Sequence, residues 1–230
     1  MATILCPSPN DFYEAYKQID PNKAILMLSL TKGLSSTYDN AVSGKDMLLE
    51  EEPDRQIAVI NSKTASCGLA LLLHEANRKM EEGILFDDLV THLYERIEQT
   101  KTLFVLKTLE NLVRGGRLDK VKGKIAKTLN IKLLMKATED DGTIEVTEKV
   151  RGDKRSIRRF VDQIGDHTKQ FENKIISMTH TNDEAKGKQV LADIMATYPF
   201  KEGLLTETGP LISTYAGEGA LVISFFGDKR

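Results

Sequence analysis

The sequence predicts a two-domain α/β protein, and three observations lead to this fold class. In the first half of the chain, apolar runs of strand length alternate with helical patterns, which is typical of a parallel sheet covered by helices. In the second half, an Asp-Gly turn signal separates two extended runs, which predicts an antiparallel sheet. Residues 1–102 hold 10 Lys and Arg against 16 Asp and Glu, whereas residues 103–230 hold 22 against 18. We therefore expect a parallel α/β domain over 1–102 and an α+β domain with a mainly antiparallel sheet over 103–230.

The first predicted domain contains two copies of a strand–loop–helix pattern. In the first copy, the mostly apolar run 24–30 precedes the hydroxyl-rich loop 31–37. In the second copy, the strand 56–60 precedes the polar loop 61–66. Such loops lie outside the carboxyl ends of parallel strands, where hydroxyls and the N–H groups of a helix start can hold an anion. We expect the two loops to share one pocket.

Helices are predicted on either side of these strands. Ser8 is a suitable N-cap and Pro9 suits the first helical position of a helix that ends near residue 20. A helix that opens near Gly68 is expected to stop at Gly83. Another amphipathic helix follows over 89–97, before a strand at 103–106.

The second predicted domain has a mixed pattern. The expected hairpin turn is Glu139 to Gly142. The predicted helices lie at about 109–113, 121–129, 154–171 and 183–197, and the predicted strands at 131–137, 143–150, 174–178, near 204 and at 220–226.

Several function classes find no support in the sequence. Cys6 and Cys67 lie far apart and form no C-x-x-C motif, so neither a disulfide framework nor a zinc site is indicated. The chain has no G-x-S-x-G elbow and no Walker loop with the correct spacing. No apolar run approaches the ~20 residues that span a bilayer, and the start of the sequence has no basic region before an apolar stretch, so we expect neither a membrane anchor nor a signal peptide. We expect a cytoplasmic protein that is not an enzyme by itself and needs no metal or other cofactor.

Six motifs occur along the chain in the order found in one protein family. They are Leu34 to Tyr38, Ser62 to Ser66 with Gly68, Thr108-Leu109 with Gly115 to Leu118, Leu129 to Lys132, Lys149 to Gly152, and Gly209-Pro210 with Gly217 to Ala220. In this set and order the sequence resembles the DegV family. That resemblance implies a long-chain fatty acid bound in a cleft between two α/β domains, and a carrier subunit for a bacterial fatty acid kinase.

The resemblance also implies roles for individual residues. The fatty acid is then the only bound ligand, and a kinase catalytic subunit, rather than nucleic acid, is the expected protein partner. The expected contacts to the fatty acid come from Ser35, Ser36, Ile4, Leu5, Ser62, Ser66 and Tyr215. Arg117, with Arg114 and Lys120, is expected to face a phosphoryl-transferring partner, because a guanidinium offers paired donors to phosphate oxygens.

The chain departs from the family pattern at three places. It looks truncated at its amino end, without the usual first strand and Thr-Asp-Ser segment. Ile4-Leu5 stands where the family has Thr-Ser, and Thr214-Tyr215 stands where it has Thr-His. The first substitution removes two hydroxyls, and the second replaces an imidazole by a phenol that can still donate one hydrogen bond near pH 7.

Other interpretations of the same residues stay open. Ser35, Ser36 and Thr37 are also ordinary capping residues, and Arg117 could satisfy carbonyls at a helix end. The run from Arg114 to Lys136 holds eight basic residues against one acid. It is typical of a solvated face, but it also suits a basic nucleic-acid-binding or regulatory module.

Overall fold

The structure is a computed structural model that describes residues 4–118 and 131–228. The chain forms two compact units: the first comprises residues 1–65, 72–98 and 139–143, and the second residues 66–71, 99–138 and 144–230. The short segments 66–71 and 139–143 therefore belong to a different unit from their neighbours in sequence. The predicted domains 1–102 and 103–230, with a ligand cleft between them, stay a prediction.

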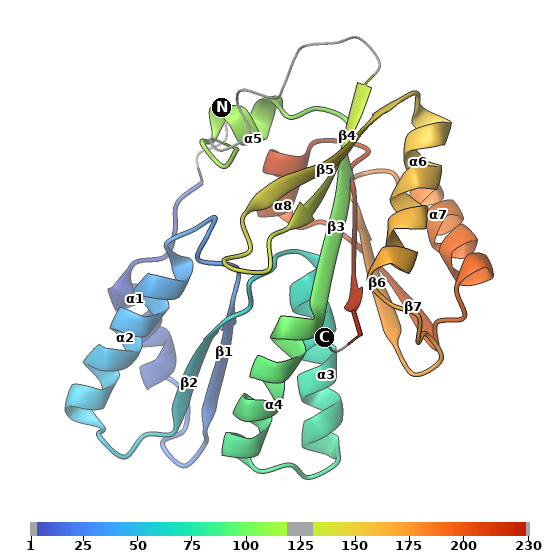
Figure 1. Ribbon diagram of the computed structural model, residues 1–230. Helices are drawn as coiled ribbons and strands as arrows, with labels where there is room; N and C mark the ends of the chain where they lie inside the picture. The colour runs from blue at the N-terminus through green and yellow to red at the C-terminus, as the bar shows by residue number, and fades with distance from the viewer. Residues whose placement is uncertain (1–3, 119–130, 229–230) are drawn as a thin grey trace. The chain divides into compact units, whose positions relative to one another are not determined.

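The first unit is built on a two-stranded parallel sheet (Figure 1). Strands β1 (Ile25–Ser29) and β2 (Ile57–Asn61) pair in register from Ile25 opposite Ile57 to Ser29 opposite Asn61. Both strands were predicted from their apolar runs. Their carboxyl ends meet at one edge, so the loops that follow them start side by side.

Two helices pack with this sheet. Helix α1 (Pro9–Lys17) begins with a capping box between Ser8 and Asp11, as the Ser8-Pro9 signal predicted. Helix α2 (Thr37–Glu51) lies so close to α1 that a Cβ on Gly44 would be 2.7 Å from Phe12 Cβ. The core of this unit is made of Tyr16, Ile25, Ala41, Leu48 and Val59.

Helices α3 (Cys67–Glu81) and α4 (Phe86–Gln99) are joined by a turn in which Gly83 takes φ +81°, which confirms the predicted C-cap. Between them lies the buried carboxylate of Glu75. Arg78 donates to it from Nε and Nη2 at 3.0 Å, and its Oε1 is 2.7 Å from His92 Nε2 and 3.2 Å from Arg96 Nε. Burial raises the pKa of Glu75, but these hydrogen bonds and the two guanidinium charges outweigh it and lower the pKa to about 2.

The second unit contains a six-stranded sheet in the order β5-β4-β3-β8-β6-β7. All neighbours are antiparallel except β6 and β7, which confirms the prediction of a mainly antiparallel sheet. The strands are β3 (Thr100–Leu106), β4 (Ile131–Ala137), β5 (Ile144–Arg151), β6 (Ile175–His180), β7 (Glu202–Glu207) and β8 (Leu221–Phe226).

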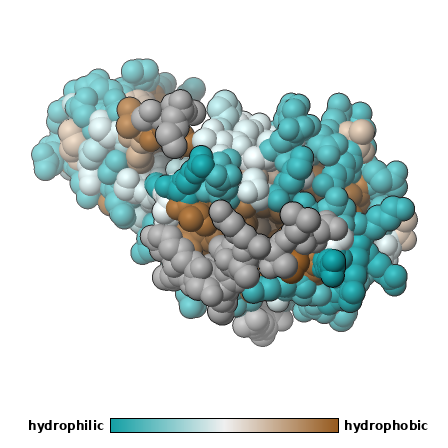
Figure 2. Space-filling view, turned by 90° about the horizontal axis from the view of Figure 1, so that it is seen from above, coloured by the Kyte–Doolittle hydropathy of each residue, from teal (hydrophilic) through white to brown (hydrophobic). Residues whose placement is uncertain are grey.

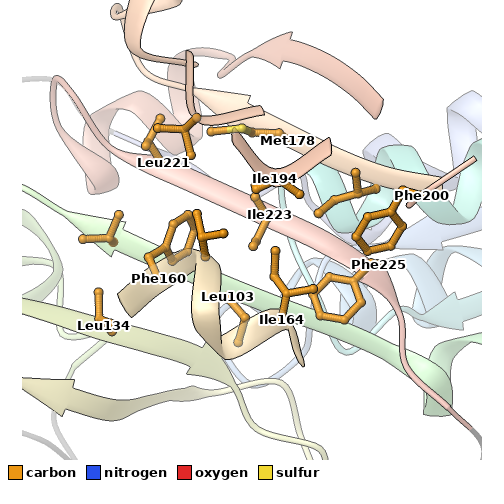
Figure 3. Close-up of a cluster of buried hydrophobic side chains, with 14 of the residues drawn as sticks. Leu103, Leu134, Phe160, Ile164, Met178, Ile194, Phe200, Leu221, Ile223 and Phe225 are labelled. Atoms are coloured by element: carbon orange, nitrogen blue, oxygen red, sulfur yellow. The ribbon is translucent and has the colours of Figure 1, made fainter. Parts of the chain in front are cut away.

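Helices α6 (Asp153–Asp162) and α7 (Glu184–Thr197) pack on one face of this sheet over a core of large apolar side chains (Figure 3). Phe160 of α6 has no exposed surface and lies in this core with Leu103 and Ile223. A second apolar cluster contains Leu133 and Met135, which alternate along β4 with Leu134 of the first cluster. It also includes residues of α5 (Glu110–Arg114) and α8 (Pro210–Ala216).

Two expectations for the second half were wrong. The helix predicted over 154–171 ends at Asp162 and continues only as a 3-10 turn over Gln163–Asp166, where Gly165 lies against the Tyr198 ring. Helix α8 was not predicted, although Pro210 at its first turn is a helix-start signal. The helix predicted over 121–129 lies outside the described residues.

The surface in the view of Figure 2 is mainly hydrophilic or neutral, with hydrophobic surface confined to patches. In the described part of the chain, every helix is too short or too polar to span a bilayer.

Candidate functional site

A cluster of hydrogen-bonding side chains forms where β1 is followed by α2 in the first unit. Cys6 Sγ lies 3.2 Å from Thr37 Oγ1 and 3.6 Å from Asn40 Nδ2. Ser35 Oγ is 2.8 Å from the same Thr37 hydroxyl and accepts a hydrogen bond from Thr37 N at 3.2 Å. We call Cys6, Ser35, Ser36, Thr37 and Asn40 the hydroxyl cluster. It brings the segment before α1 together with the predicted loop 31–37.

The hydrogen bonds of the hydroxyl cluster act on the Cys6 thiol. Burial raises the pKa of the Cys6 thiol, but hydrogen bonds with Thr37, Ser36, Ser35 and Asn40 outweigh this effect, and the net pKa lies below its ordinary value. The start of α2 adds the partial positive charge of a helix N-terminus. Donors that favour a thiolate also favour another anion, such as a carboxylate, at the same place.

Four of the predicted ligand-contacting residues lie in this region, and only two of them belong to the hydroxyl cluster. Ser35 and Ser36 belong to the hydroxyl cluster, and Ser36 makes no side-chain capping bond to α2. Ile4 and Leu5 precede Cys6, and their side chains are 38% and 83% exposed. Both of these side chains therefore have surface in contact with water.

The second predicted loop has its hydroxyls engaged locally. Ser62 is fully buried, and its hydroxyl donates to Thr64 O at 3.2 Å and accepts from Thr64 N at 3.3 Å. Ser66 takes φ +55°, and its carbonyl accepts from Leu69 N at 3.1 Å, so it starts α3. These two serines shape the loop in this structure.

The turn between β4 and β5 belongs to the first unit and contacts both of these loops. Residues 138–143 connect the last pair, Ala137 and Ile144, so the predicted hairpin is confirmed with a six-residue turn. Thr31 Oγ1 donates to the Asp141 carbonyl, and Thr31 N donates to Thr64 O at 2.8 Å. One residue of the β1–α2 loop thus holds both the β2–α3 loop and the hairpin turn.

In the second unit, Arg117 and Tyr215 come together. Arg117 Nη1 donates to the Gly115 carbonyl at 2.6 Å, and its guanidinium carbon lies 5.6 Å from the centre of the Tyr215 ring. The ring packs so closely that a Cβ on Gly115 would lie 2.5 Å from Tyr215 Cε1. This cation–π arrangement holds the planar, charged guanidinium of Arg117 beside the Tyr215 ring, within the predicted basic run.

The other basic residues of that run have local acidic partners where the structure describes them. Arg114 pairs with Glu110, and Lys120 lies outside the described residues. Lys132 lies 3.4 Å from Asp153 and Lys136 3.3 Å from Glu145. These pairs reduce the net positive field of the described part of the run.

A buried row of hydroxyls crosses three strands of the six-stranded sheet. Thr102 Oγ1 lies 2.8 Å from Ser224 Oγ, and Ser177 stands opposite Ser224 on the next strand. Cys67 Sγ is 3.6 Å from Ser224 Oγ, and burial raises the pKa of its thiol to about 11. Among the described residues, Ser177 Oγ has no hydrogen-bond partner.

The sequence predicted Thr37 only as part of the anion-holding loop 31–37, with helix capping as the alternative. It did not indicate Asn40, and Cys6 served only to exclude a disulfide framework and a zinc site. The usable signal was the polarity of the residue just before Pro7, next to the position where Ile4-Leu5 replaces two hydroxyls. Among the described residues, no three His, Cys, Asp or Glu side chains gather as they would around a metal ion.

Comparison with known proteins identifies the family. A family model described as an uncharacterised protein of the DegV family matches residues 1–228. The chain belongs to the DegV family. A curated relative, a DegV domain-containing protein of Streptococcus pneumoniae, is 34% identical over 220 residues, which cover 96% of this chain and 76% of the relative. The predicted family membership is therefore confirmed.

Solved structures of DegV proteins are similar to this chain in fold. The Fatty Acid Kinase (Fak) B3 protein of S. pneumoniae, loaded with linoleic acid, has a TM-score of 0.87 and 33% identity, covering 97% of this chain and 77% of its own. A DegV family protein of Ruminococcus gnavus, whose crystal structure is described with vaccenic acid, has a TM-score of 0.89 and 32% identity, covering 95% and 77%. A third DegV protein, from Eubacterium eligens and loaded with heptadecanoic acid, has 26% identity and a TM-score of 0.86, covering 97% and 79%. The predicted α/β fold class is confirmed.

Proposed function

We propose that this chain binds one long-chain fatty acid and presents its carboxylate to a separate kinase subunit. The observation that carries the proposal is the similarity to two DegV proteins, each above 30% identity over at least 95% of this chain, with linoleic acid in one and vaccenic acid in the other. The chain acts as a non-catalytic carrier, and the fatty acid is its ligand. A cytoplasmic location fits this role.

The physical basis of binding is the burial of an acyl chain together with a held carboxylate. Sixteen carbons at roughly 0.8 kcal/mol per CH₂ supply on the order of 10 kcal/mol of transfer free energy, from which association and ordering costs are subtracted. We place the carboxylate at the hydroxyl cluster, because hydroxyl and amide groups gather there at the start of α2. Ser35, Ser36, Thr37 and Asn40 are the donors we assign to the carboxylate.

The nucleic-acid alternative has weaker support. Arg114, Lys132 and Lys136 each lie near an acidic side chain of the same unit, and the whole chain carries a formal net charge of −2. Electrostatic binding to nucleic acid depends on a concentrated positive surface. We therefore keep the fatty acid as the ligand.

The direct test is to identify what the purified protein carries. The protein is expressed in bacteria, purified under native conditions, denatured and extracted with organic solvent, and the extract is examined by mass spectrometry. We expect about one equivalent of fatty acid with 16 to 18 carbons. An extract without fatty acid, from protein that also fails to bind added oleic acid in calorimetry, would contradict the proposal.

Substituting Ser35 by alanine is expected to weaken fatty acid binding by about 0.5–3 kcal/mol, as expected for the loss of one hydrogen bond to a charged group. Titration with a fluorescent acyl analogue measures the change in Kd. Ser43→Ala on α2 is the matched control, because Ser43 Oγ donates to the Asp39 carbonyl within the helix. Equal affinities for the Ser35→Ala variant and the control would remove Ser35 from the carboxylate site.

Substituting Arg117 by lysine is expected to leave fatty acid affinity within about twofold and to slow phosphorylation of the bound acid at least tenfold. Lysine keeps the charge but loses the planar pair of donors that suits phosphate oxygens, and one such bond is worth about 1.5–3 kcal/mol. The rate is measured with an added kinase subunit and ATP, with Arg158→Lys, at an exposed position of α6, as the control. Loss of lipid binding with normal transfer from preloaded protein would place Arg117 at the carboxylate instead.

A further inference from the structure

The turn between β4 and β5 is held against both loops of the candidate site. Thr31 is fully buried. Its hydroxyl donates to the Asp141 carbonyl and accepts from Gly33 N at 3.1 Å, while its backbone N donates to Thr64 O at 2.8 Å. A single side chain thus connects the β1–α2 loop to the turn, and its backbone connects the same loop to the β2–α3 loop.

Two glycines show how tightly the turn is seated. Gly142 takes φ +68°, and a Cβ at this position would overlap the Lys63 carbonyl and lie 2.6 Å from Thr31 Oγ1. A Cβ on Gly33 would lie 2.6 Å from the Asp141 carbonyl. Both distances are far below an ordinary van der Waals contact, so neither position accepts a side chain unless the turn moves away.

The residues of the β1–α2 loop that contact the turn lie a few positions before the proposed donors. Thr31 and Gly33 precede the proposed donors Ser35, Ser36 and Thr37 in the same loop, and Lys63 lies in the neighbouring β2–α3 loop. The turn is also held within itself, because the Asp141 carboxylate accepts from Thr143 N at 3.0 Å.

From these contacts we infer that the β4–β5 turn, residues 139–143, is a clasp that fixes the conformation of the β1–α2 loop, which carries the proposed donors, and of the β2–α3 loop beside it. Thr31 and Gly142 are its positioning residues, and release of the clasp controls how fast the ligand leaves. The inference rests on the proposed fatty acid site. It adds a kinetic role for residues that do not touch the carboxylate.

The test compares variants that release the clasp with matched controls. Thr31→Val keeps the side-chain shape and removes the hydroxyl, while Thr31→Ser keeps the hydroxyl. Gly142→Ala adds a Cβ where the Lys63 carbonyl blocks it. Gly83→Ala is the control for backbone strain, because Gly83 takes φ +81° with nothing within 4 Å of its Cβ position.

The first measurement is the dissociation rate of a fluorescent long-chain fatty acid, followed by stopped flow with excess unlabelled oleic acid. We expect Thr31→Val and Gly142→Ala to release it at least tenfold faster than the unsubstituted protein, and Thr31→Ser and Gly83→Ala to stay within about twofold. Equal rates for Thr31→Val and Thr31→Ser would overturn the clasp.

The second measurement separates the clasp from the proposed ligand. Hydrogen exchange of the ligand-free protein, followed by mass spectrometry, reports the opening of residues 31–37 and 61–66. Thr31→Val is expected to raise exchange at least tenfold in both loops, and Gly83→Ala in neither. If no fatty acid binds but the loops open as expected, the proposed function fails while the clasp stands. Unchanged exchange in both loops would reject the clasp, whatever the ligand.

Discussion

Replacing Glu75 by glutamine should lower the free energy of unfolding of the first unit by about 3 kcal/mol. The carboxylate is buried between α3 and α4, and the variant leaves Arg78 and Arg96 without their shared anion. Breaking a buried pair costs about 3–5 kcal/mol. The lower end of that range applies because the side chains of these two arginines are 42% and 23% exposed, so water takes up part of the lost interaction. Denaturant unfolding at pH 7 measures the change.

The same cluster predicts a pH dependence. The pKa of Glu75 is lowered to about 2 from an ordinary value of 4.5, so its contribution is fully present above about pH 4.5. That contribution is lost as the pH falls towards 2, because the unfolded chain binds the proton first. The difference in unfolding free energy between the unsubstituted protein and Glu75→Gln should therefore shrink between pH 4.5 and 2. The other carboxylates are the same in both proteins, so their contribution to the pH dependence cancels in this difference.

A surface ion pair provides the control for this experiment. Glu51 pairs with Lys17 in the same unit at 2.7 Å, and the two side chains are 52% and 46% exposed. Glu51→Gln should change the unfolding free energy of that unit far less than Glu75→Gln does. Equal effects of the two substitutions at pH 7 would show that the buried cluster does not stabilise the fold as described.

Replacing Phe160 by alanine should destabilise the second unit by about 3–5 kcal/mol. The ring has no exposed surface and packs with Leu103, Ile164 and Ile223 in the core beneath α6 (Figure 3). Its removal loses the transfer free energy of the ring and leaves a cavity that the sheet cannot fill. The unfolding midpoint in denaturant should fall by the corresponding amount.

An exposed apolar residue of the same unit is the control for Phe160. Leu211 on α8 is 39% exposed, and Leu211→Ala should cost about 1 kcal/mol or less. The two units need not unfold together, so fluorescence and circular dichroism should be followed in the same titration. A loss below 1 kcal/mol for Phe160→Ala would contradict the core assigned to α6 and the sheet.

Local patterns predicted most of the strands and several helix ends. The apolar runs at β1, β2 and β8 and the Ser8-Pro9 start of α1 act through neighbours in sequence, so they are visible without a structure. The end of α6 at Asp162 is different. The chain leaves the helix where Gly165 meets Tyr198, a residue more than thirty positions away, and periodicity contains no information about such a contact.

The candidate site was predictable only in part, for the same reason. The loop with Ser35 and Ser36 follows from the strand–loop–helix pattern, whereas Cys6 reaches Thr37 across 31 residues. The Asp-Gly signal correctly predicted a hairpin, and Gly142 takes the positive φ that such a turn needs. Nothing in that signal indicated that Asp141 would meet Thr31, 110 residues earlier.

The first turn of α3 limits how this protein can be divided or recombined. Residues 66–71 belong to the second unit, where Cys67 Sγ donates to the Val222 carbonyl at 3.4 Å, while α3 from Leu72 onward belongs to the first. A genetic crossover at residue 102 would take β8 and residues 66–71 from different parents, and the residue beside the buried Ser224 hydroxyl would then come from the other parent. The two halves are therefore not interchangeable modules, and chimaeras between relatives need residues 66–71 from the same parent as the six-stranded sheet.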